Sequence, residues 1–109
     1  MSWIVRGEDV LAAAELAATR HDRRVGLMGR HELDGALVLR PCRQVHTFGV
    51  RFPIDVAFCD ADGFVLHTVT LPPRRVSRVV LRSAFVVEAS AGAFDRWKLA
   101  LGDVIEVRG

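Results

Sequence analysis

Long apolar runs are missing from this sequence. No stretch approaches the roughly 20 apolar residues that a membrane-spanning helix requires, so we expect no membrane partner. The N-terminal segment Met1–Gly7 also lacks the long apolar core of a secretory signal peptide. The sequence therefore predicts a cytoplasmic protein.

Cysteine is scarce as well. The chain contains only Cys42 and Cys59, and neither belongs to a C-x-x-C pair of the kind that holds zinc. In the cytoplasm two such cysteines are more often reduced thiols than a disulfide. We therefore expect no metal site and no cofactor.

Lysine is almost absent, because 14 of the 15 basic residues are arginine and only Lys98 is lysine. A GC-rich genome explains such a bias. Four arginines follow Pro72-Pro73, and a cluster of this kind can bind phosphate or nucleic acid. No aromatic residues interleave them, however, and the net charge is only +2. We expect a solvated rim and no nucleic acid partner at this cluster, which comprises Arg74, Arg75, Arg78 and Arg82.

What is present describes one globular domain, residues 1–109. Apolar residues make up 50% of the chain, which is too many for a disordered protein. A chain of this length buries about two-thirds of its unfolded surface and needs no disulfide or metal to fold.

The clearest local pattern is a β-hairpin. Ile54, Val56 and Phe58 alternate with polar or small residues, which predicts a strand. Residues 60–63 have the Asp-Ala-Asp-Gly composition of a turn, and residues 64–71 form a second strand rich in Val and Thr.

The register of this hairpin decides which side chains meet. If Asp60 lies opposite Phe64, alternation places Asp55, Cys59 and His67 on one face, about 5 to 8 Å apart. A slip of one residue would separate them. This face is either a site or simply the more polar side of the hairpin.

A second candidate pair is Cys42 and His46, which are four residues apart. They can meet on a helical turn, whereas on a strand they would stand about 13 Å apart. A cysteine beside a histidine can be an activated nucleophile. A free cysteine is more often a small buried apolar residue.

Further elements are predicted from apolar patterns. We expect strands at 3–6, 35–39, 85–89 and 104–107, and a helix that Ser90 caps and that continues to about Leu99. Phe94, Trp97 and Leu101 would form the apolar face of this helix. Glu88 is the unusual residue in its strand, because a buried carboxylate needs an Arg or backbone N–H partner.

Several phrases together resemble the family known as domain of unknown function 192. They extend from about residue 10 to the end of the chain and comprise Gly26–Arg30, His46–Phe48, Phe52–Asp55, Asp60–Gly63, Glu88–Gly92 and Leu101–Asp103. Many members have Trp-Met-Lys-Asn-Thr where this chain has Gln44-Val45-His46-Thr47, so chemistry that depends on that lysine does not carry over.

The resemblance implies a compact β-rich domain with short helices and no established activity. It implies a strand at 10–19, although the Ala-rich composition there favours a helix. It also implies a helix from about Asp22 to Met28, which Asp22 can cap and Gly29 can end. The predicted fold is α+β: a mainly antiparallel curved sheet or partly open barrel with two short helices, and the 54–71 hairpin at its centre.

Three functions are compatible with these residues. The first is binding of a small polar or anionic ligand or a peptide near the 42–55 loop. We favour it because it requires the fewest residues with unusual chemical properties. That pocket would be lined by His46, Thr47, Arg51, Asp55 and Glu88.

The second function is that of a hydrolase- or transferase-like enzyme, in which Cys42 is the nucleophile, His46 or His67 is the base and Asp55 orients the imidazole. The third is a non-enzymatic assembly partner that acts through an exposed strand edge. For the chain itself we expect a monomer or a weak homodimer.

Overall fold

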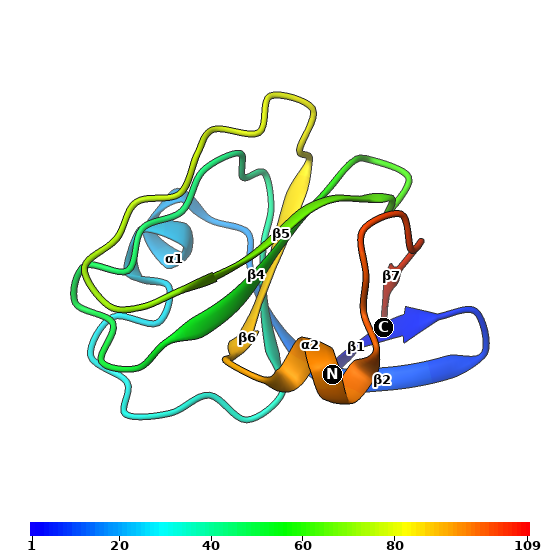
Figure 1. Ribbon diagram of the computed structural model, residues 1–109, viewed down its shortest axis with the longest axis horizontal. Helices are drawn as coiled ribbons and strands as arrows, with labels where there is room; N and C mark the ends of the chain where they lie inside the picture. Colours follow the sequence, from blue (N-terminus) through cyan, green and yellow to red (C-terminus); the bar gives the residue numbers. More distant parts are fainter.

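The computed structural model describes all 109 residues and contains one seven-stranded sheet that curls into a half barrel (Figure 1). Its spatial order is β5-β4-β6-β3-β2-β1-β7, and every neighbouring pair is antiparallel except β2 with β3. The predicted α+β fold with a mainly antiparallel curved sheet and two short helices is confirmed. The strands are β1 Ser2–Arg6, β2 Asp9–Ala17, β3 Ala36–Leu39, β4 Ile54–Cys59, β5 Val65–Leu71, β6 Phe85–Ser90 and β7 Glu106–Arg108.

The predicted hairpin is present as β4 and β5, but it lies at one edge of the sheet and not at its centre. Its turn forms as expected, because the Asp60 carboxylate accepts hydrogen bonds from the N–H groups of Asp62 and Phe64 at 2.9 and 3.0 Å. An aspartate that bonds the backbone two residues ahead favours such turns.

The predicted register of the hairpin is wrong beyond its first pair. Cys59 pairs with Val65 as expected, but Phe58 then pairs with His67, so an irregularity shifts the register by one residue. The shift moves His67 to the Phe58 side, where the two rings lie 5.9 Å apart. The expected grouping of Asp55, Cys59 and His67 on one face is therefore broken.

The segment 10–19 forms most of β2, as the family resemblance implied and against its helical composition. Pairing with β1 on one edge and β3 on the other overrides the propensity of its alanines. The helix that follows, α1 (Arg20–Val25), is capped by Thr19, whose Oγ1 accepts a hydrogen bond from the Asp22 N–H. It ends at Gly26, which adopts φ +47°. The expected boundaries at Asp22 and Gly29 are wrong, because Thr19 and Gly26 cap the helix instead.

The second helix, α2 (Ala93–Trp97), is capped by a residue from a distant strand. Ser90 does not cap it, because its hydroxyl donates to the Leu33 carbonyl at 2.8 Å. The residue that caps the helix is Asp55 of β4. One of its carboxylate oxygens accepts hydrogen bonds from the N–H groups of Gly92 and Phe94 at 3.0 and 3.1 Å.

The expected apolar face of α2 is only partly correct. Phe94 is buried and Trp97 is half-buried, but the helix ends before Leu101, whose side chain is 63% exposed. Leu99 packs into the core in its place. Neither helix has the length and apolar character needed to cross a bilayer. The cytoplasmic location stays a prediction.

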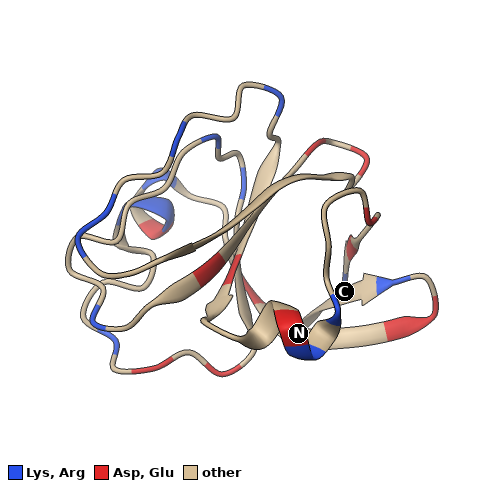
Figure 2. Ribbon diagram, viewed as in Figure 1, with Lys and Arg blue, Asp and Glu red and all other residues tan.

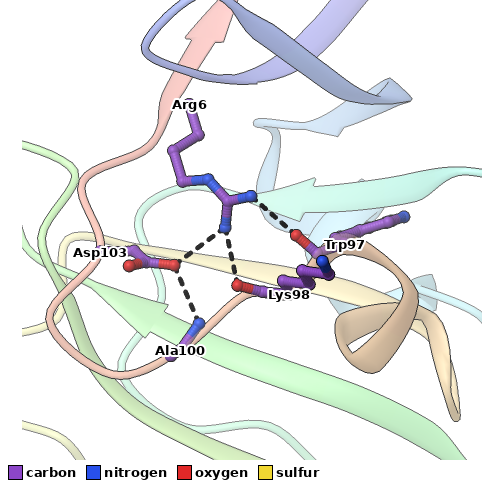
Figure 3. A network of polar contacts seen from close by, with 5 residues as sticks. All are labelled: Arg6, Trp97, Lys98, Ala100 and Asp103. Carbon is purple, nitrogen blue, oxygen red and sulfur yellow. Dashed lines mark hydrogen bonds and ion pairs between the residues drawn. The ribbon is translucent and has the colours of Figure 1, made fainter.

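The end of α2 is fixed to β1 through Arg6 (Figure 3). The Arg6 guanidinium donates to the carbonyl oxygens of Trp97 and Lys98, both at 2.8 Å, and pairs with the Asp103 carboxylate at 3.0 Å. Asp103 also accepts a hydrogen bond from the Ala100 N–H. A cation at this position satisfies carbonyl groups that have no partner at the end of a helix.

The half barrel is partly closed where the tip of the hairpin meets the segment before β7. Phe64 and Val104 form an isolated antiparallel bridge. Hydrogen bonds join the N–H of Val65 to the Asp103 carbonyl at 2.8 Å and the N–H of Ile105 to the Gly63 carbonyl at 2.9 Å. The two edges of the sheet are therefore linked at one end.

The two faces of the sheet carry separate apolar clusters. One includes Ala57, Phe94 and Ile105, so it lies on the α2 side. The other includes Leu27, Leu37 and Val56, so it lies under α1 and the long loops. This second side carries the candidate site.

Candidate functional site

A hollow of about 380 Å³ lies between α1 and the extended segment 41–46. Its lining includes residues of α1 and the turn after it, residues 41–46, and Glu88 of β6. Small-molecule pockets commonly have volumes of about 300 to 1,000 Å³. The hollow therefore has room for a ligand of modest size.

One wall of the hollow is held in place by the loop 72–80. The N–H of Thr47 donates to the Arg75 carbonyl, and the N–H of Ser77 donates to the Val45 carbonyl, both at 2.8 Å. The buried Thr47 hydroxyl accepts from the Arg75 N–H at 2.8 Å and donates to the Pro72 carbonyl at 2.7 Å. Thr47 thus positions the wall and has no group left for a ligand.

Glu88 is part of the lining of the hollow and is only 4% exposed. Its cross-strand neighbours are the apolar residues Leu37 and Val56. The expected Arg or N–H partner is absent, because no protein group donates a hydrogen bond to its carboxylate. Burial raises the pKa of Glu88 to about 7. At neutral pH the side chain is therefore divided between the acid and the carboxylate.

Arginine side chains surround the entrance to the hollow. Arg20, Arg24 and Arg43 are exposed, and their guanidinium groups form no ion pair or hydrogen bond within the protein. Arg23 is different, since it donates to the carbonyl oxygens of Ala18 and Arg40. Figure 2 shows basic residues gathered around α1 and the neighbouring loops, with acidic residues prominent toward the β1–β2 turn, the hairpin tip and β7. The hollow therefore opens into a positively charged part of the surface.

Cys42 and His46 both line the hollow, but they do not form a catalytic pair. The Cys42 thiol donates to the Gln44 carbonyl at 3.3 Å, and the His46 Nδ1 accepts from the Phe48 N–H at 3.2 Å. No hydrogen bond joins the thiol to the imidazole. Burial raises the pKa of Cys42, which disfavours the thiolate. Nucleophilic catalysis requires the opposite shift and a base in contact.

The model of the family DUF192, described as "Uncharacterized ACR", matches residues 3–107. This chain belongs to the DUF192 family. No curated protein gives a match. A crystal structure of a protein of unknown function from Novosphingobium aromaticivorans DSM 12444 is similar, with a TM-score of 0.81 and 22% identity over 96% of this chain and 82% of that chain.

A crystal structure from Sinorhizobium meliloti 1021, of a protein named as a candidate transcription regulator, is also similar. The TM-score is 0.80, with 22% identity over 97% of this chain and 91% of that chain. At this level of identity both likenesses show the fold alone.

In this DUF192 protein the hollow contains only some of the residues that the sequence pointed to. Cys42, His46 and Glu88 line it. Asp55 lies on the opposite face of the sheet, because it adjoins Val56 in β4 while Val56 shares the face of Glu88. There it caps α2, and its other oxygen accepts a hydrogen bond from the Thr70 hydroxyl at 2.7 Å.

The remaining predicted residues lie outside the lining of this hollow. Arg51 is exposed elsewhere, and His67 packs against Phe58. The arginines of the 74–82 cluster also lie outside the hollow and are exposed. Sequence reasoning missed the α1 arginines at the entrance. Their signal was the basic run at 20–24, directly before the family phrase that begins at Gly26.

Cys42 in the DUF192 hollow is expected to alkylate slowly with iodoacetamide, with an apparent pKa above the ordinary value of about 8.5. The physical reason is its burial, which disfavours the thiolate. The measurement is the rate of alkylation against pH in the Cys59→Ser variant, which isolates Cys42. The His46→Ala change should leave the profile unchanged. A pKa below about 7 that His46→Ala abolishes would contradict this expectation and restore the enzyme hypothesis.

Proposed function

We propose that this protein binds a small molecule or peptide that carries an anionic group and a hydrogen-bond donor, in the hollow between α1 and residues 41–46. One observation carries the proposal. A buried carboxyl group without a protein partner, Glu88, lines a hollow whose entrance presents three free guanidinium groups. Such an arrangement suits a ligand with two different ends.

The arginines favour the anionic end of the ligand. A guanidinium group binds a carboxylate or phosphate with two parallel hydrogen bonds, and such charge-assisted bonds are the stronger ones. Arg20, Arg24 and Arg43 have this capacity free, because no acidic residue neutralises them. The ligand's anionic group is therefore expected at the entrance.

Glu88 favours a donor at the inner end of the ligand. The Glu88 carboxylate accepts no hydrogen bond from the protein, and its oxygens are not completely buried, since no fully buried side-chain oxygen lacks a partner. A donor on the ligand would replace water there with a charge-assisted hydrogen bond. A hydroxyl or ammonium group of the ligand would supply that bond to the carboxylate. Binding is favoured over catalysis because the Cys42 thiol and the His46 ring each bond to the backbone and not to each other.

The test compares L-malate with succinate, which differ by one hydroxyl group, by isothermal titration calorimetry at pH 8. The protein is expected to bind malate about tenfold more tightly, the value of one good hydrogen bond to a charged group. In the Glu88→Leu variant this preference should disappear. Equal affinities in the wild type, or binding of neither malate nor any acidic peptide, would count against the proposal.

Charge reversal at the entrance tests the other end of the ligand. Arg24→Glu and Arg43→Glu are each expected to weaken malate binding by about tenfold or more. Arg96→Glu is the matched control, because Arg96 is exposed and belongs to α2, on the opposite face of the sheet from the hollow. At physiological salt it should change the affinity by less than about twofold, since charges beyond about 8 Å are screened. Equal losses in all three variants would indicate non-specific attraction to a basic surface.

A further inference from the structure

The wall formed by residues 43–47 has one bonded edge and one free edge. On the bonded edge, Arg43, Val45 and Thr47 pair with the loop 75–80 through backbone hydrogen bonds. His46 and Val76 form an isolated antiparallel bridge there, without bonds of their own. In such a pairing the backbone groups of alternate residues point to opposite edges.

Gln44 and His46 are the alternate residues, and their backbone groups are free. The N–H of Gln44 and both the N–H and the carbonyl of His46 form no hydrogen bond within the protein. The Gln44 carbonyl accepts only from the Cys42 thiol, a weak donor. Four backbone groups are thus available on one edge.

This free edge lies on the side away from the loop 75–80, and it belongs to residues that line the hollow. The loop 75–80 occupies the opposite edge, and Gln44 and His46 line the hollow together with α1. A row of free N–H and C=O groups at two-residue spacing is a template for another extended chain. The arginines beside it select for negative charge.

We propose that the occupant of the hollow is an acidic peptide that adds to residues 44–46 as a short antiparallel strand. This inference rests on the proposed function and narrows its ligand to a peptide. One peptide residue exchanges two backbone hydrogen bonds with His46, and another bonds to Gln44 two residues away. An acidic side chain or the terminal carboxylate meets Arg20, Arg24 or Arg43, and an inward side chain donates to Glu88.

The backbone pattern distinguishes this occupant from other anions. A nucleic acid strand could pair with the arginines, but it does not present alternating N–H and C=O groups at the spacing of a strand. A small organic acid could reach Glu88 and an arginine, but it would leave the edge of Gln44 and His46 unused. Only a bound peptide is therefore expected to protect the N–H groups of Gln44 and His46 from hydrogen exchange.

The probe is a pool of N-acetylated hexapeptides that end in Asp-Glu and vary at the four preceding positions among Val, Thr, Ser and Lys. Amide hydrogen exchange is followed by NMR on the full chain with the tightest-binding peptide. We expect exchange at Gln44 and His46 to slow about tenfold or more at saturation. Val45 and Thr47 already donate hydrogen bonds and should not change. L-malate should protect neither Gln44 nor His46.

Two substitutions at one position separate the backbone from the side chain. His46→Pro removes the free N–H, whereas His46→Ala keeps it. Both substitutions remove the Nδ1 that accepts from the Phe48 N–H, and both leave the backbone hydrogen bonds of the wall in place. We expect His46→Pro to weaken the peptide about tenfold or more and His46→Ala to change it by less than about threefold. N-methylation of the peptide amides, one at a time, gives the same test if the proline variant does not fold.

The outcomes separate the two proposals. Peptide binding without protection of Gln44 and His46, or with equal affinity for His46→Pro and His46→Ala, would overturn the strand addition. If malate binds but no peptide in the pool does, this inference is wrong and the proposed function stands. If neither binds, both are wrong.

Discussion

The wild type is expected to lose about 3 kcal/mol of folding stability as the pH rises from 4.5 to 8, and the Glu88→Gln variant is expected not to show this loss. Burial raises the pKa of Glu88 from 4.5 to about 7 in the folded protein. Because the raised value belongs to the folded state, the folded protein binds the proton more tightly than the unfolded chain does. The stabilisation is therefore complete below about pH 4.5 and is lost as the pH rises through about 7.

The measurement is the free energy of unfolding in urea at intervals from pH 4.5 to 8.5, for the wild type and Glu88→Gln. The difference between the two curves isolates Glu88, since the other titrating groups are shared. Glu32→Gln, at an exposed carboxylate, is the control for the loss of one negative charge. Parallel curves for Glu88→Gln and the wild type would show that the Glu88 carboxyl group is solvated or paired.

Gly63→Ala is expected to destabilise the protein by about 3 kcal/mol or more, because backbone strain and steric overlap add at this residue. Gly63 adopts φ +88°, which side-chain-bearing residues rarely adopt. A Cβ atom there would overlap the carbonyl oxygen of Ile105, in the segment that closes the half barrel. The overlap cannot be relieved by a side-chain rotation, since the obstructing atom belongs to the backbone.

Gly7→Ala is the matched control for this prediction. Gly7 has φ +61°, and a Cβ atom added to it would meet no atom within 4 Å. It should therefore cost only the backbone strain, about 1 to 2 kcal/mol. Thermal unfolding of the two variants measures the difference. Equal losses would mean that the contact between the hairpin tip and Ile105 does not hold the barrel closed.

Elements set by local chemistry could be predicted from the sequence. The alternation of Ile54, Val56 and Phe58 and the Asp-Gly turn at 60–63 predict the hairpin, because strand and turn are decided by neighbouring residues. The shift of register that brings Phe58 opposite His67 could not be predicted, since no glycine or proline marks it. The Ala-rich composition of β2 favours a helix, but the segment forms a strand because pairing on both of its edges outweighs helix propensity.

Only part of the candidate site could be predicted from the sequence. Glu88 stood out as a carboxylate in a buried strand, and it does line the hollow. Asp55 and Thr47 also stood out in the sequence as polar candidates for the site, but both stabilise the fold. Asp55 caps α2, and Thr47 anchors the loop 72–80. The arginines of α1 reach the hollow only because α1 packs beside residues 41–46, which is a tertiary property.

The central claim is that the hollow lined by Glu88 binds an anion. Its most direct test is a titration of isotope-labelled protein with L-malate, followed by two-dimensional NMR of the backbone amides and the arginine side chains. We predict saturable shifts confined to α1, to residues 26–28, to residues 42–46 and to Glu88. Shifts that grow without saturation, or that centre on Arg74–Arg82 or on Asp55 across the sheet, would contradict the claim.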